Sequence, residues 1–504
     1  MGNTTIDPQT AVAAAAEENP HHARRWLILV VLAAAQLMVV LDSTVVNIAL
    51  PSAQRALAFS NGDRQWIVTA YSLAFGSLLL LGGRLADLFG RKNVFLIGLV
   101  GFAAASAAGG AATGFSMLVV ARAVQGGFGA LLAPAALALL TTTFTNPAER
   151  GKAFGIYGAI AGGGAAVGLL LGGVLTEYLS WRWCMYVNIA FAVPALIGGL
   201  ILLAGRASET RPKLDLPGTI TVSAGLFAVV YGFAHAETAG WGSPVTIGFL
   251  LVAVVLLAVF ALLQQRVAHP LLPLRVVLDR NRGGGFLAML LAAGGMFGVF
   301  LFLTYYLQQN LGYSAVKTGL AFLPMCIVLV LIAAVVSAVL SQRVGPKVTI
   351  PTGMAIGAVA MVLLTRIGVQ SHYLSDLLPS LLLLGVGLGL IFATGMSIAT
   401  LGVDPDDAGV ASAAVNTMQQ VGGSVGTALL NTLAATAAAS FLAGKVTAGK
   451  VPSALVSAEA SIHSYTTAFW WSAGFFAAGA VLCGLILRPG VPALDPEAEP
   501  AMMH

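Results

Sequence analysis

Fourteen stretches of predominantly apolar residues follow one another along the 504-residue chain. A helix needs about 20 such residues to cross the roughly 30 Å apolar core of a bilayer. Only 9% of the residues are charged, against about a quarter in soluble domains, so lipid must be the solvent for most of the surface. We therefore predict an all-α, polytopic membrane protein with fourteen transmembrane helices. The expected spans are residues 26–50, 66–84, 94–112, 116–140, 153–175, 185–204, 217–234, 246–264, 284–308, 318–340, 348–367, 377–401, 410–438 and 466–487.

The basic residues between these spans predict an orientation. If the N-terminus is cytoplasmic, 17 of the 25 Lys and Arg residues fall in inner segments and 7 in outer ones. This distribution satisfies the positive-inside rule and places both termini in the cytoplasm, with the protein in the plasma (inner) membrane. The first apolar stretch is too long for a signal peptide, so we expect it to be retained as the first span.

The spacing of the spans predicts two halves. Six spans lie within residues 26–204 and six within 283–488, with one extra helical hairpin within 205–282. Tails of residues 1–25 and 489–504 flank them, and charged segments at 205–215 and 265–282 are the expected linkers. Two six-helix bundles are typical of a transporter that is built from repeats.

Charged side chains are nearly excluded from the expected spans. Only Asp42 and Arg122 lie well inside one, although burying a charge at mid-bilayer costs at least about 2.5–3.5 kcal/mol. Helix rise places Asp42 roughly 24 Å along the first span and Arg122 roughly 10 Å below the outer face. Because these depths are similar, each is the expected counter-ion of the other. The alternatives are a purely structural ion pair, or an Arg122 side chain that extends to water.

Uncharged polar residues inside the spans are the next candidates. They either line a water-filled cavity or form hydrogen bonds between helices. The candidates for the cavity are Gln36, Asn47, Tyr71, Gln125, Tyr157, Tyr305, Asn416 and Gln420.

The sequence lacks the motifs of several enzyme classes. No GxxxxGK[ST] motif occurs, so ATP is not expected to drive this chain, and HExxH and GxSxG motifs are also missing. The three cysteines lie far apart, which indicates neither a disulfide framework nor a zinc site. We therefore expect no enzyme activity, no metal and no nucleic-acid partner.

Several motifs resemble those of the major facilitator superfamily. The segment from Gly83 to Lys92 (GRLADLFGRK) resembles its signature loop between spans 2 and 3. The segment 41–51 (LDSTVVNIALP) is similar to the first-span motif of the fourteen-span drug:proton antiporter branch, and 122–126 (RAVQG) to the fourth-span motif of proton-coupled members. The fifth span keeps the glycine spacing of the antiporter motif, but Leu169 stands where that motif usually has proline, which removes a device that kinks helices.

This resemblance implies roles for particular residues. Asp42 would bind the proton and Arg122 would be its partner. The cytoplasmic gate would include Gly83, Asp87, Gly90 and Arg91. The antiporter helix would use Gly155, Gly164, Gly168, Gly172 and Gly173.

The function that the resemblance implies is export of small hydrophobic compounds, such as drugs, antibiotics and dyes, in exchange for protons. The proton gradient would supply the energy without a cofactor, and we expect a monomer in the lipid bilayer. One alternative is an importer or exchanger of a polar metabolite, which charged residues in the second-half spans would indicate. Another is a non-transporting membrane sensor, which a large soluble domain would indicate.

Overall fold

The computed structural model describes residues 24–60, 63–144, 147–203, 215–267, 270–272, 274–340, 343–401, 403, 408–445 and 453–490. In these ranges every regular element is a helix, because a chain in lipid must satisfy its backbone polar groups within each segment. The helices of the first half and the hairpin are α2 (Arg25–Leu57), α3 (Arg64–Phe89), α4 (Arg91–Gly110), α5 (Phe115–Thr143), α6 (Pro147–Tyr178), α7 (Trp183–Leu202), α8 (Leu216–Ala239) and α9 (Pro244–Arg266). The others are α10 (Leu274–Val277), α11 (Arg280–Tyr305), η2 (Tyr306–Asn310), α12 (Ala315–Ala338), α13 (Pro346–Leu364), η4 (Tyr373–Leu377), α14 (Leu378–Thr400), α15 (Ala408–Lys445) and α16 (Ala454–Ile486).

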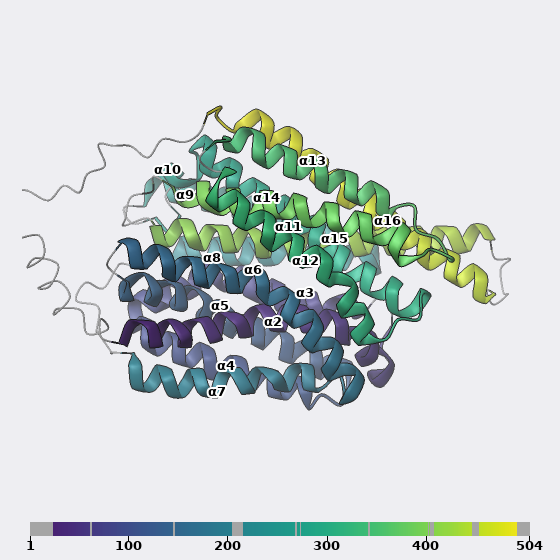
Figure 1. Cartoon of the computed structure of the whole chain (residues 1–504), viewed down its shortest axis with the longest axis horizontal. Helices are drawn as coiled ribbons and strands as arrows, with labels where there is room; N and C mark the ends of the chain where they lie inside the picture. The colour runs from purple at the N-terminus through teal and green to yellow at the C-terminus, as the bar shows by residue number, and fades with distance from the viewer. Residues whose placement is uncertain are drawn as a thin grey trace, which may run out of the picture.

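The expected all-α membrane fold is confirmed. Thirteen described helices are long and apolar enough to cross a membrane, and the described apolar part of α6, Gly164–Tyr178, is shorter by the same criteria. Together they correspond to the fourteen expected spans. The helices run side by side along the long axis of the molecule, and α2 begins at the same end at which α16 finishes (Figure 1).

Several helices are longer than the apolar stretches that predicted them. α2 continues past Pro51 to Leu57, and α15 and α16 reach Lys445 and Ala454. Polar residues end an apolar stretch without breaking helical hydrogen bonds. Hydropathy therefore marks the part of a helix that crosses the membrane, whereas capping residues mark the ends of the helix. Ser453 is such a cap, since its side chain accepts a hydrogen bond from the Val456 amide. The joined ends of α15 and α16 project beyond the other helices (Figure 1).

The helices pack as two groups with a hairpin between them. Helices α2 to α7 pack mainly on one another, and so do α11 to α16 (Figure 1). Helix α8 pairs with α9 and also packs against α3 of the first group and α15 of the second. The Trp66 and Tyr231 rings lie 6.0 Å apart on the α3 side, and Thr432 on α15 donates a hydrogen bond to the Phe233 carbonyl. Most of the linker 205–215 lies outside the described residues.

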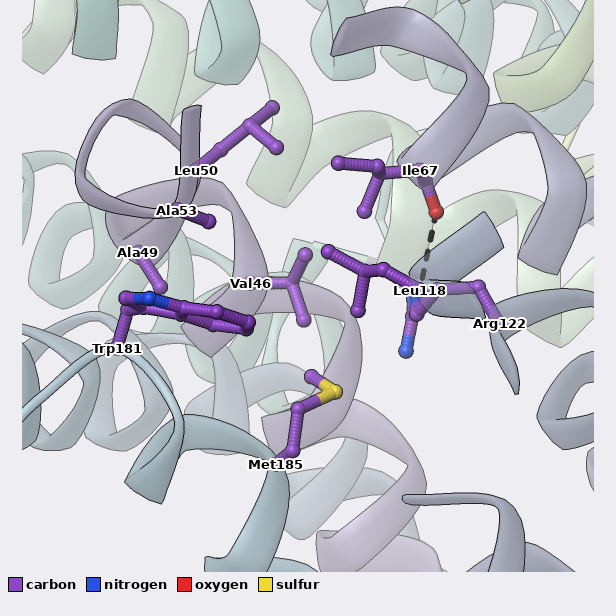
Figure 2. Close-up of a pocket in the computed structure, with 9 residues that line it drawn as sticks. All are labelled: Val46, Ala49, Leu50, Ala53, Ile67, Leu118, Arg122, Trp181 and Met185. Carbon is purple, nitrogen blue, oxygen red and sulfur yellow. Dashed lines mark hydrogen bonds between the residues drawn. The ribbon is translucent and has the colours of Figure 1, made fainter. Parts of the chain in front are cut away.

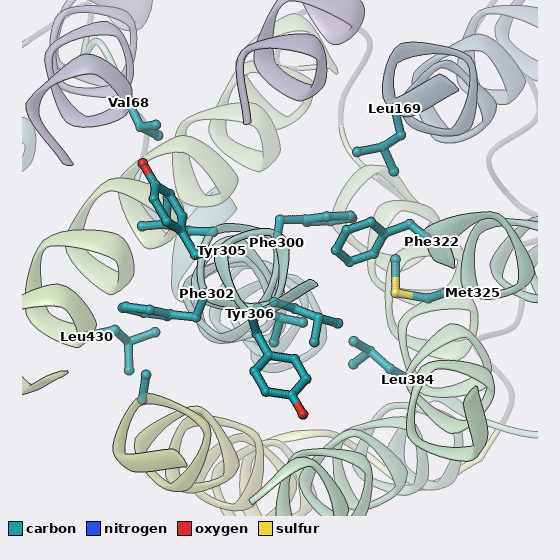
Figure 3. Close-up of a cluster of buried hydrophobic side chains, with 14 of the residues drawn as sticks. Val68, Leu169, Phe300, Phe302, Tyr305, Tyr306, Phe322, Met325, Leu384 and Leu430 are labelled. Carbon is teal, nitrogen blue, oxygen red and sulfur yellow. The ribbon is translucent and has the colours of Figure 1, made fainter. Parts of the chain in front are cut away.

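The two groups meet in a cluster of buried aromatic residues around the end of α11 and η2. Figure 3 shows Val68 and Leu169, from α3 and α6, facing this cluster from the first group. The Tyr305 hydroxyl donates a hydrogen bond to Gln54 Oε1 on α2 (2.9 Å), and the Arg64 guanidinium lies 4.1 Å from the centre of the Tyr305 ring. Apolar packing, a hydrogen bond and a cation–π contact therefore join the groups at this end.

Candidate functional site

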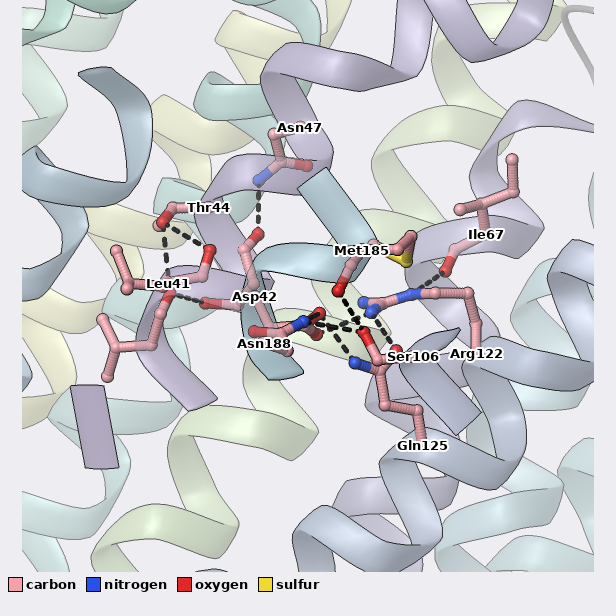
Figure 4. A network of polar contacts seen from close by, with 12 residues as sticks. Leu41, Asp42, Thr44, Asn47, Ile67, Ser106, Arg122, Gln125, Met185 and Asn188 are labelled. Carbon is pink, nitrogen blue, oxygen red and sulfur yellow. Dashed lines mark hydrogen bonds and ion pairs between the residues drawn. The ribbon is translucent and has the colours of Figure 1, made fainter. Parts of the chain in front are cut away.

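Helices α2 and α5 bring Asp42 and Arg122 into direct contact. Arg122 Nη1 lies 2.6 Å from Asp42 Oδ2, and the two side chains are 2% and 0% exposed (Figure 4). The pairing expected from the sequence is therefore present, while the role of the pair in proton coupling stays a prediction. Removing one member of such a buried pair typically costs about 3–5 kcal/mol, because the other charge is left uncompensated.

Two amide side chains complete the coordination of the carboxylate. Gln125 Nε2 donates to Asp42 Oδ1 over 2.7 Å, and Gln125 Oε1 accepts from Arg122 Nη1. Asn188 Nδ2, from α7, donates to the same Asp42 oxygen over 2.8 Å. Asp42 thus receives hydrogen bonds from three side chains, the arrangement that a buried ionised carboxylate requires.

The guanidinium of Arg122 is held from the α3 side. Its Nε donates to the Ile67 carbonyl over 3.3 Å, and its Cζ lies 4.3 Å from the centre of the Tyr71 ring. Gly126 permits this close approach, because a Cβ at that position would lie 2.2 Å from the Tyr71 carbonyl oxygen. A glycine of the fourth-span motif therefore allows α5 to pack tightly on α3.

A small pocket lies beside Arg122 (Figure 2). Its volume is about 10 Å³, close to the space that a single water requires. A drug-sized molecule does not fit. The residues that line it are Val46, Ala49, Leu50, Ala53, Ile67, Leu118, Arg122, Trp181 and Met185.

The glycines of the antiporter motif lie at helix interfaces. Gly164, Gly168 and Gly172 face α2, where a Cβ would meet residues such as Thr44 and Val45. Gly173 faces α12 instead, and on α12 a Cβ at Gly319 would lie 2.5 Å from the Leu169 carbonyl. Helix α6 thus packs tightly on α2 of its own group and on α12 of the second group. The surroundings of Gly155 lie outside the part of the chain that the structure describes.

The residues expected to form the cytoplasmic gate lie at the junction of α3 and α4. Gly90 separates these helices and has φ = +88°, a conformation that favours glycine. Gly83 lies in the last part of α3, where a Cβ would touch Pro134 at 3.6 Å. Arg91 begins α4 and is partly buried. The side chain of Asp87 lies outside the described residues, so its expected role stays a prediction.

The predicted cavity residues separate into several places. Tyr71 and Gln125 belong to the Arg122 network, and the Tyr157 hydroxyl donates to Gln36 Oε1 over 2.8 Å. Asn47 bonds its own helix at the Ser43 carbonyl. The others contribute to contacts between the groups or lie on α15: Tyr305 bonds Gln54, Gln420 packs near Gly76, and Asn416 is partly buried. This placement does not test their role in a cavity.

Sequence reasoning missed three polar residues. Asn188 and Ser106 are fully buried and belong to the Asp42 network. Arg64, which falls in the outer segment between the first two expected spans, is instead 7% exposed at the start of α3. An amide within the otherwise apolar sixth span was a signal for Asn188, whereas nothing in the sequence placed Tyr305 over Arg64.

Comparisons with known proteins identify the family and the fold of the chain. Residues 32–427 match the sequence profile of the Major Facilitator Superfamily. The chain is 50% identical over 462 residues to the puromycin resistance protein of Streptomyces alboniger, covering 91% of each chain. It is 38% identical over 470 residues to the cephamycin export protein of Amycolatopsis lactamdurans, covering 93% of this chain and 92% of the other. The crystal structure of an auto-inhibited POT family peptide transporter shares the fold, with a TM-score of 0.66 at 16% identity over 92% of this chain and 96% of that one.

Proposed function

The chain belongs to the major facilitator superfamily, and we propose that it exports small lipophilic, antibiotic-like compounds from the cytoplasm in exchange for protons. The relatives with resistance and export functions support the direction and the class of substrate. The observation that carries proton coupling is the Asp42–Arg122 pair, since it is an ion pair sealed inside a membrane bundle at 0% and 2% exposure. A charge buried at such cost is by default a candidate for function.

Coupling would work through the strength of this pair. Ionised Asp42 holds Arg122 and thereby ties α2 to α5. A proton from outside neutralises the carboxylate, weakens the tie and shifts the balance between two conformations of the halves. Substrate and proton need only have different affinities for those conformations. The proton gradient is the energy source in this scheme, and no cofactor takes part.

The substrate would not touch Asp42 in the conformation described here. The carboxylate is fully buried, and the pocket beside Arg122 has a volume of only about 10 Å³. Substrate would instead bind between the halves, near polar residues such as Gln36 and Tyr157. Proton and substrate would then communicate through helix movement.

We also propose a monomer in the plasma membrane with both termini in the cytoplasm. The end of the bundle that holds Arg64 and Tyr305 would then face outward, and the α3–α4 connection with Gly83, Gly90 and Arg91 would form part of the inner gate. The excess of basic residues in the inner segments supports this orientation.

Transport into inside-out membrane vesicles tests the proposal. Puromycin is the first probe, followed by a panel of antibiotics and dyes. An imposed proton gradient should drive accumulation in wild type. Asp42→Asn, which mimics the neutral state, should insert normally and exchange labelled probe, yet fail to accumulate it. Arg122→Gln in the same background separates loss of pairing from loss of coupling. Full gradient-driven accumulation by Asp42→Asn at normal expression would reject Asp42 as the coupling residue.

A further inference from the structure

The amide of Asn188 is only half used. Its Nδ2 donates to Asp42 Oδ1 and to Ser106 Oγ, each over 2.8 Å (Figure 4). Its Oδ1 is buried and has no hydrogen-bond partner among the described residues. An unsatisfied buried acceptor is costly and calls for an explanation.

The orientation of this amide follows from its neighbours. Ser106 uses its single hydrogen to donate to the Met185 carbonyl over 2.8 Å, so Ser106 Oγ can only accept from Asn188. An ionised Asp42 likewise can only accept. Because both groups are acceptors, Asn188 must present its NH₂ to them, and its carbonyl oxygen is left without a donor.

Protonation of Asp42 reverses this requirement. The carboxylic acid gains an O–H donor, which needs an acceptor in a site that is closed to bulk water. Gln125 Oε1 already accepts from Arg122, whereas Asn188 Oδ1 is vacant. Rotation of the Asn188 amide by about 180°, between the two states that such a terminal torsion favours, would present that oxygen to the acid.

We propose that Asn188 is a positioning residue for proton coupling, which donates to ionised Asp42 and accepts from protonated Asp42 after its amide turns over. The Ser106 hydroxyl turns with it, from the Met185 carbonyl to Asn188 Oδ1. One proton is added to Asp42 and no other covalent bond changes. This inference rests on the proposed function, because it gives the neutral carboxyl group an acceptor. In exchange, the Asn188 N–H groups and the Met185 carbonyl lose the partners that they have in the ionised state.

Asp42 is the group in this network that would take the proton. The charged and titratable groups that face it in the described residues are Arg122 on α5, Tyr71 on α3 and Cys184 on α7. Arginine stays protonated, while phenols and thiols ordinarily stay neutral at physiological pH. Helix α4 contributes Ser106, which does not titrate, and the described glycines of α6 meet other residues of α2, such as Val40 and Thr44.

Infrared difference spectroscopy of the purified protein in lipid bilayers tests the proposal without a transported substrate. A pH titration should show the C=O band of protonated Asp42, which is identified by its loss in Asp42→Asn. In Asn188→Leu the acid loses its acceptor, so this band should move to higher frequency. In Ser106→Ala the Asn188 oxygen serves the acid alone, so the band should move to lower frequency.

Asn431→Leu is the matched control, because it replaces another buried asparagine, 2% exposed on α15, and should leave the band in place. An unchanged band in Asn188→Leu would overturn the proposal. If that variant does not fold, an unchanged band in Ser106→Ala would overturn it equally. Failure of the proposed function looks different: no band sensitive to Asp42→Asn would then appear at any pH at which the transporter works.

Discussion

The strength of the buried ion pair can be measured by removing its two charges separately and together. In Arg122→Gln, Asp42 keeps the donors Gln125 and Asn188 but loses its counter-charge, at a cost of about 3–5 kcal/mol. In Asp42→Asn, Arg122 keeps the Ile67 carbonyl and Gln125 Oε1, so we expect a smaller loss of about 2–3 kcal/mol. The double variant leaves two neutral amides that can bond each other, and should lose only about 1–2 kcal/mol. The coupling energy should therefore be about 3–7 kcal/mol.

Unfolding by sodium dodecyl sulfate in mixed micelles, followed by tryptophan fluorescence, measures these free energies. The loss in Arg122→Gln should be complete where Asp42 is ionised and should shrink as the pH falls, because a proton then replaces the missing cation. The loss in the double variant should not depend on pH in this way. If the single losses add to within about 0.5 kcal/mol of the double loss, the two charges do not stabilise each other and our account of the site is wrong.

Three further predictions concern the packing of the halves and the topology. Gly319→Ala would place a Cβ 2.5 Å from the Leu169 carbonyl and should lower the free energy of unfolding by about 1–3 kcal/mol. Gly248→Ala on α9, with open space around it, should leave that free energy unchanged or raise it by up to about 1 kcal/mol in the same assay; equal losses in the two variants would contradict close α6–α12 packing. Arg64→Ala removes the cation from the Tyr305 ring. A thiol reagent added outside should then label Val68→Cys about tenfold faster, as expected for a contact of roughly 1–2 kcal/mol. An unchanged labelling rate would show that this contact does not hold the outer end closed. Gly242→Cys, in the turn between α8 and α9 and in a cysteine-free background, should react with an impermeant reagent on intact cells; labelling only after lysis would invert the proposed orientation.

The sequence predicted the fold because lipid imposes a simple rule. Apolar length alone located the thirteen described helices that are long and apolar enough to cross a membrane, since the backbone in lipid has few alternatives to a helix. The same rule found Asp42 and Arg122, because charge stands out where nearly everything else is apolar. It could not set the ends of α15 and α16, where polar residues continue the helix outside the apolar stretch.

The finer geometry of the site depends on contacts between distant helices. Asn188 is one of many amides in the chain, and only the packing of α7 on α2 and α4 brings it to Asp42 and Ser106. Arg64 was expected in a loop because it lies just outside an apolar stretch, yet the next half supplies the ring that covers it. Such partners are chosen by tertiary packing, which the periodicity of one segment does not encode.

The position of the α8–α9 hairpin decides where lipid can touch the seam between the halves. Because α8 packs on both α3 and α15, the acyl chains on that flank meet α9, which presents Leu251, Val254 and Leu262 to them. The seam between α6 and α12 has no such cover, since neither α8 nor α9 makes substantial contact with those two helices in the described chain. The molecule is therefore asymmetric about this seam, since the hairpin covers one flank, whereas on the other flank only the close packing of α6 on α12 separates the seam from lipid.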